Sequence, residues 1–76
     1  MRDALLSMVR MIVDHPDDVR VTTLQGAQTL IFELRCNNGD VGKVIGKDGK
    51  TVGALRTLLG VMAARQGRKA VLEVVE

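Results

Sequence analysis

The stretch VIGKDGKTV, residues 44–52, sets two glycines three positions apart between short apolar segments. It lies within residues 41–53, which hold four glycines and three lysines in thirteen positions. Glycine has no Cβ, so it allows sharp turns and a close approach of the backbone to a ligand. The stretch therefore predicts a tight cationic loop. Three roles compete for it: the phosphate loop of a nucleotide-binding enzyme, a clamp on nucleic acid, or a turn between two helices.

The enzymatic interpretation rests on Gly49-Lys50-Thr51, which matches the end of the Walker A motif G-x-x-x-x-G-K-[ST]. That motif requires a glycine at position 44, which is Val44 in this chain. A Walker A loop also follows a buried strand, whereas Asp40 is well placed to cap a short helix over residues 41–45. We expect no enzymatic activity and no cofactor. With Cys36 as the only cysteine, we also expect no disulfide and no zinc site.

Hydrophobic periodicity predicts the remaining elements. A first amphipathic helix is expected to run to His15-Pro16, with an apolar face of Leu5, Met8, Val9 and Ile12. Strands are expected over residues 19–24 and 28–36, the second with Leu30, Phe32, Leu34 and Cys36 on its core face. A long helix should run from Lys50 to about Gln66 and end at Gly67. A third strand, KAVLEVV, closes the chain, with Ala70, Leu72 and Val74 opposed to Val71, Glu73 and Val75.

The order is α-β-β-α-α-β, which predicts an α+β fold: a three-stranded mixed sheet covered on one face by three helices. The 76 residues are enough for one small domain. No run of roughly 18 apolar residues suits a membrane span, and the first residues lack the apolar core of a signal peptide. We therefore expect a soluble cytoplasmic protein.

Charge is distributed unevenly along the chain. Residues 1–40 carry a net charge of −2, residues 41–69 a net charge of +6, and the last seven residues −2. Clustered Lys and Arg favour a phosphate-rich partner, because they release condensed counterions from nucleic acid. An ordinary solvated helix face is the alternative explanation.

Set between two helices, Val44-Ile45-Gly46-Lys47-Asp48-Gly49, with Val52 three residues further on, resembles the KH signature V-I-G-x-x-G-x-x-I. The element order resembles the prokaryotic type II KH fold, and the whole chain resembles the KhpA group of small KH proteins. The resemblance implies one KH domain over residues 1–76, with a helix-strand extension (1–27) and a β-α-α-β core (28–76). It also implies that the loop clamps about four nucleotides of single-stranded RNA beside an aliphatic groove. The groove would be lined by Val44, Ile45 and strand residues 31–35.

The expected RNA-binding residues are Lys43, Val44, Ile45, Gly46, Lys47, Asp48, Gly49 and Lys50. Phe32 is the only aromatic residue, so stacking of bases on aromatic side chains is nearly excluded. Asp48 is expected to cap the following helix and to oppose phosphate. The family suggests a post-transcriptional regulator or RNA chaperone, with single-stranded RNA as partner, and with no membrane and no small-molecule substrate.

A second surface is formed by small residues at helical spacing, namely Gly53, Thr57, Gly60 and Ala64. This strip could receive the first helix or the sheet of the same chain, or it could be a dimer seam. The resemblance favours the seam, since KhpA-like proteins form homodimers or pair with a larger KH protein of the Jag type. The alternative function is therefore a protein-interaction module in which RNA contact is secondary.

Overall fold

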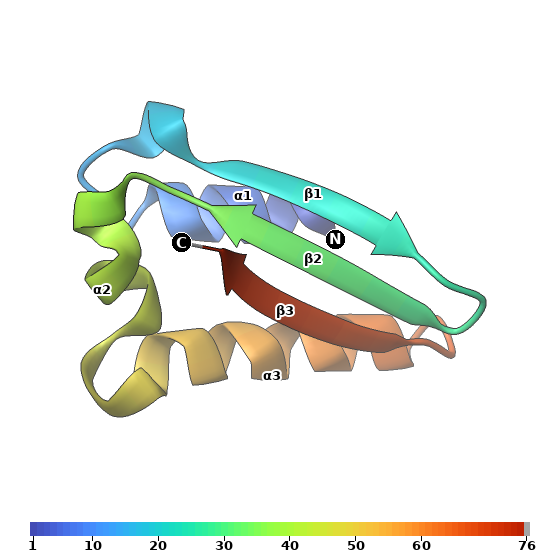
Figure 1. The fold of residues 1–76 in the computed structure, drawn as a ribbon. Coiled ribbons are helices and arrows are strands. Elements are labelled where there is room, and N and C mark those ends of the chain that lie inside the picture. The colour runs from blue at the N-terminus through green and yellow to red at the C-terminus, as the bar shows by residue number, and fades with distance from the viewer. Residues whose placement is uncertain (76) are drawn as a thin grey trace.

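The helices and strands follow the expected order in the computed structural model, which describes residues 1–75 (Figure 1). The helices are α1 (Arg2–Arg10), α2 (Val41–Ile45) and α3 (Lys50–Ala64). The strands are β1 (Arg20–Gln25), β2 (Thr29–Arg35) and β3 (Lys69–Val75). Short 3₁₀ turns lie between them: η1 (Pro16–Asp18), η2 (Asn38–Asp40) and η3 (Lys47–Gly49). The predicted α-β-β-α-α-β order is confirmed.

The sheet is mixed, as predicted. Its strand order is β1-β2-β3, with β1 antiparallel to β2 and β3 parallel to β2. Parallel neighbours need a crossover connection, and here α2 and α3 provide it. The helices lie behind the sheet in the view of Figure 1, which leaves the front face open. This arrangement sets α2 and the glycine loop at one end of the molecule and the β1–β2 hairpin at the other.

The core is aliphatic and lies between the helices and one face of the sheet. Alternate residues of β2 fill it, since Leu30, Phe32 and Leu34 are at most 4% exposed. The helices contribute Leu5, Val9, Val52, Leu55 and Leu59 to the cluster, and Val44 anchors α2 in it. Cys36 is half-buried against this cluster, which agrees with its predicted place on the core face. Burial, and secondarily the negative charge of Asp40, raise the pKa of its thiol, so it stays protonated.

The first helix is shorter than predicted. It ends at Arg10 rather than near His15, and Ile12 is 40% exposed instead of lying on the core face. The cause lies elsewhere in the chain, because the amides of Asp14 and His15 bond to the Asp40 carboxylate instead of continuing the helix. The last helix matches its prediction more closely. It ends at Ala64, and Gly67 takes the left-handed conformation (φ 69°) expected of a helix-ending glycine.

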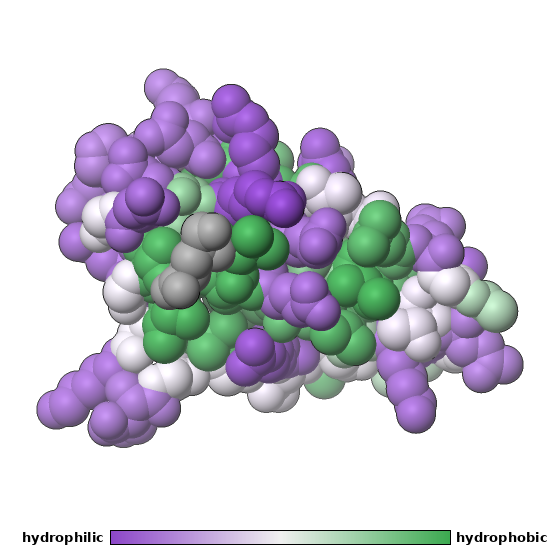
Figure 2. Space-filling view, in the orientation of Figure 1, coloured by the Kyte–Doolittle hydropathy of each residue, from purple (hydrophilic) through white to green (hydrophobic). Residues whose placement is uncertain are grey.

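The open face of the sheet carries one apolar row. Leu24, Ile31 and Val71 lie side by side across the three strands, and Leu24 and Val71 are 49% and 42% exposed. Figure 2 shows this apolar surface toward the hairpin, and a second one between α2 and the carboxyl end of β3. No helix within residues 1–75 is both long enough and apolar enough to cross a membrane.

Candidate nucleic-acid interface

The glycine loop depends on two backbone conformations that favour glycine. Gly46 has φ 77° and ψ 169°, and Gly49 has φ 73° and ψ 15°. At Gly46 a side chain is excluded by sterics as well as by backbone strain, since a Cβ there would lie 2.8 Å from the amide nitrogen of Thr51. The amide of Gly46 donates to the carbonyl of Gly42, and that of Gly49 to the carbonyl of Gly46. The chain thereby turns from α2 into α3 within four residues.

Asp48 owes its place in the loop to its backbone. It is the only residue other than glycine with positive φ among residues 1–75 (φ 57°, ψ 26°), a conformation that Asp and Asn tolerate better than most residues. The expectation that its side chain caps the following helix is wrong, because Gly49 is the N-cap of α3 and no side chain within the described residues makes a capping bond there. The first amides of α3 are therefore left without a side-chain partner at the positive end of the helix dipole.

The basic residues of the middle segment separate into two groups in space. Lys47 lies in the loop and Lys50 directly follows it; both are exposed and make no ion pair within residues 1–75. Lys43 differs, because its Nζ lies 3.2 Å from a carboxylate oxygen of Asp14. The other group, Arg65, Arg68 and Lys69, follows the far end of α3. Arg56 lies between the two groups and donates to the carbonyl of Leu72.

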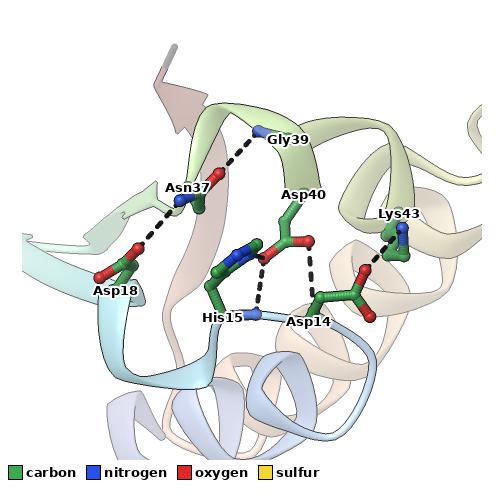
Figure 3. Close-up of polar contacts among 7 residues, drawn as sticks. All are labelled: Asp14, His15, Asp18, Asn37, Gly39, Asp40 and Lys43. Carbon is green, nitrogen blue, oxygen red and sulfur yellow. Dashed lines mark hydrogen bonds and ion pairs between the residues drawn. The ribbon is translucent and has the colours of Figure 1, made fainter.

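A buried carboxylate holds the short helix α2 in place (Figure 3). Asp40 is fully buried, and its oxygens accept from the amides of Asp14 (3.2 Å) and His15 (2.9 Å) and from Nδ1 of the His15 ring (3.1 Å). The expected capping role is wrong for this side chain, since it makes no bond to the amides of α2. It instead ties the segment after α1 to the start of α2. Sequence analysis missed this contact, because its partners are 25 and 26 residues away.

The charge state of Asp40 follows from these bonds. Burial alone would raise the pKa of this carboxyl group, but the two backbone amides and the His15 ring together hold the pKa below its ordinary value. Asn37 extends the network, since its side chain donates to Asp18 and accepts from the amide of Gly39. The polar contacts of Figure 3 thus fix the position of α2, and the glycine loop directly follows α2.

The structure places the residues expected to line the RNA groove, namely Val44, Ile45 and residues 31–35, differently from the prediction. Val44 is fully buried and therefore supports the loop from the core, while Ile45 is half-buried. Strand β2 is the middle strand, so both of its edges are paired. Its odd-numbered residues face the open side of the sheet, and Leu34 lies in the core. Apolar surface beside α2 is instead found toward the carboxyl end of β3 (Figure 2).

The strip of small residues on α3 lies on the surface. A Cβ added at Gly53 or at Gly60 would have no atom within 4 Å outside its own helix and chain neighbours. The alternative in which this strip packs inside the same chain is therefore wrong. Beside it, Leu58 and Val61 are 48% and 58% exposed.

Comparison with known proteins places the chain in a family. The model described as "KhpA/KhpB, KH domain" matches residues 2–74. Proteins named RNA-binding protein KhpA are similar over nearly their full length. The one from Chlamydia muridarum is 43% identical over all of this chain and 97% of its own. The one from Aquifex aeolicus is 40% identical over all of this chain and 96% of its own. Their shared name describes binding, which agrees with the expectation that this chain is not an enzyme.

A solved structure supports the fold independently. It is described as Era in complex with MgGDPNP and nucleotides 1506–1542 of 16S ribosomal RNA. The match has a TM-score of 0.60 at 18% identity and covers 96% of this chain, which corresponds to 28% of the Era chain. The similarity is one of fold alone. The family match over residues 2–74 and the full-length relatives, together with the G-x-x-G loop between α2 and α3, identify this chain as a member of the KhpA/KhpB family of KH-domain proteins.

Proposed function

We propose that this protein binds single-stranded RNA through the GKDG loop, residues 46–49, together with the start of α3. The observation that carries the proposal is the loop geometry. Two positive-φ glycines leave both ends of the turn without a side chain, and no side chain among residues 1–75 caps the amides that open α3. A helix start of this kind attracts phosphate oxygens. The relatives named RNA-binding protein KhpA support RNA as the source of that phosphate.

The charges of the loop set the expected character of binding. Lys47 and Lys50 supply mobile cations without local ion pairs, whereas Lys43 must leave Asp14 before it can contact phosphate. Asp48 opposes phosphate from within the loop. Affinity is therefore modest and depends strongly on salt concentration. With one aromatic residue, which is buried in the core, the bases contact aliphatic side chains and backbone groups rather than aromatic rings.

A charge reversal at the loop tests the proposal. Lys47→Asp is compared with wild type, and with Lys69→Asp at the start of β3 as the control with the same change in charge. Binding of a random single-stranded RNA pool is measured by fluorescence anisotropy at several salt concentrations. We expect Lys47→Asp to weaken binding about tenfold or more at low salt and to lower the salt slope by about one. Equal binding by wild type and Lys47→Asp would remove the loop from the interface.

The exposed strip on α3 supports a second function, pairing with another KH domain. Gly53 and Gly60 would allow a partner backbone to come close, and Leu58 and Val61 would bury apolar surface that a monomer exposes. We infer a homodimer, or a heterodimer with a larger KH protein of the Jag type, through this face. Two linked RNA clamps would raise avidity, which suits a post-transcriptional regulator or RNA chaperone whose single loop binds weakly.

A further inference from the structure

A cavity of about 350 Å³ lies at the end of the molecule opposite the glycine loop. The first residues of α1, the adjoining parts of β1 and β2, and the segment after α3 surround it. Figure 1 shows the start of α1 and the end of α3 on the side of the β1–β2 hairpin, away from α2. Because the 15 residues of α3 span about 22 Å, this cavity is separate from the GKDG loop.

The cavity is electropositive. Arg2 and Arg68 line it, and among residues 1–75 no acidic side chain does. Arg68 is half-buried and makes no ion pair within residues 1–75, while Arg2 lies 3.0 Å from the exposed carboxylate of Asp3. The helix dipole adds to this charge, since α1 begins here and its N-cap residue, Met1, makes no side-chain capping bond. Guanidinium groups bind phosphate through two parallel hydrogen bonds, so the cavity favours an anionic ligand of that shape.

The remaining lining combines hydrogen-bonding groups with an apolar floor. Gln25 and Gln66 present carboxamides, and Thr23 Oγ1 is the one buried side-chain polar atom without a hydrogen-bond partner within residues 1–75. Buried polar groups in proteins almost always have hydrogen-bond partners, so a ligand that hydrogen-bonds to this hydroxyl group would be favoured. Leu30 and Phe32 close the bottom of the cavity, although at most 4% of either residue is exposed. The two carboxamides favour a ligand with hydrogen-bonding edges, as glutamine side chains pair with base edges.

We propose that this cavity binds one nucleoside phosphate, with the phosphate at Arg2 and Arg68 and the edge of the base at the carboxamides of Gln25 and Gln66. Its volume lies at the lower end of the range for small-ligand sites, about 300–1,000 Å³, which suits one nucleotide rather than a strand. The same chemistry is offered by a free mononucleotide and by the phosphorylated end of an RNA. Sequence analysis expected no small-molecule substrate, and the proposed molecule is a ligand on which no reaction is carried out.

The test is an NMR titration of the ¹⁵N-labelled protein with the four nucleoside monophosphates, the matching nucleosides and inorganic phosphate. We expect saturable shifts of the amides of Thr23, Gln25, Gln66 and Arg68 with nucleotides. Nucleosides or phosphate alone should bind at least tenfold more weakly. Equal binding of inorganic phosphate, or no saturable shift with any nucleotide, would overturn the proposal.

Variants separate this site from the RNA clamp. Arg68→Gln should weaken nucleotide binding at least tenfold and Thr23→Val about threefold, whereas Arg65→Gln, at an exposed cation nearby that does not line the cavity, should leave it unchanged. Lys47→Asp should also leave it unchanged, so the proposal stands even if the GKDG loop proves not to bind RNA. Full binding by Arg68→Gln would refute it.

Short RNAs distinguish the two sources of the nucleotide. Oligonucleotides with a 5′ phosphate, a 3′ phosphate or neither are titrated into the Lys47→Asp protein, in which the loop is disabled. If a terminal phosphate brings the oligonucleotide into the cavity with the affinity of a mononucleotide, the ligand is an RNA end. If only mononucleotides shift the cavity amides, the ligand is a free nucleotide. Either result supports the site.

Discussion

Replacing Gly46 by alanine should destabilise this protein more than the same change at any other glycine of the loop region. Gly46 occupies an extended left-handed conformation (φ 77°, ψ 169°) that is nearly exclusive to glycine and costs other residues about 1–3 kcal/mol. The added Cβ would also lie 2.8 Å from the amide nitrogen of Thr51 and still closer to its side chain. Forcing an extra methyl group into occupied space costs about 1–3 kcal/mol. The expected loss is about 2–6 kcal/mol.

Two neighbouring glycines provide matched controls. Gly49 has a left-handed helical conformation but open space around its Cα, so Gly49→Ala should cost only the backbone strain of about 1–2 kcal/mol. Gly42 lies within α2 with no atom near the new methyl group, so Gly42→Ala should stabilise the protein by about 0.5–1 kcal/mol. A chain of this length has a total stability of about 4–11 kcal/mol, so Gly46→Ala removes a large share of it.

Urea unfolding followed by far-ultraviolet circular dichroism measures all three variants, since the chain has no tryptophan or tyrosine. With a slope of about 1 kcal/mol per molar urea, the midpoint should fall by about 2–6 M for Gly46→Ala and by about 1–2 M for Gly49→Ala. It should rise by about 0.5–1 M for Gly42→Ala. Equal losses at Gly46 and Gly49 would refute the reasoning, because they would show that the contact with Thr51 adds nothing to the backbone strain.

Three further predictions concern the loop charge, the partner surface and acid stability. Asp48→Asn keeps a residue that tolerates positive φ and removes a charge that repels phosphate, so RNA affinity at low salt should rise about fivefold, or about 1 kcal/mol. An unchanged affinity in anisotropy titrations would place Asp48 away from phosphate. Gly60→Glu should give a folded monomer by light scattering coupled to size exclusion, whereas an unchanged mass would exclude the α3 face as the seam. The folded pKa of Asp40 is lowered, so the stability that its carboxylate supplies is present above about pH 4 and is lost as the pH falls through the folded value. In urea unfolding, the advantage of wild type over Asp40→Asn should therefore shrink between pH 6 and pH 3, and a constant difference would contradict the assignment.

Local patterns in the sequence determined most of the fold. Alternation identified Leu30, Phe32 and Leu34 as the core face of β2, because a strand directs alternate side chains to opposite faces. The bounds of α2 and β3 were predicted to the residue. Residues typical of turns precede α2, Gly46 follows it, and Gly67 lies shortly before β3. The G-x-x-G loop was recognised for a similar reason. Backbone positions with positive φ are mostly occupied by glycine, so the residue type itself indicates the turn.

Tertiary structure decided where polar side chains find their partners. Asp40 has the residue type and position of a helix cap, yet its carboxylate bonds to Asp14 and His15 and thereby ends α1 early. A helix end is set by competition for its last amides and carbonyls, and the competitor here is about 25 residues away in the chain. The basic middle segment was likewise one feature in the sequence and became two clusters in space, because a 15-residue helix separates its ends by about 22 Å. Burial of Val44, exposure of Gly60 and the cavity beside Thr23 all arise from the packing of elements against one another, for which a single sequence holds no local signal.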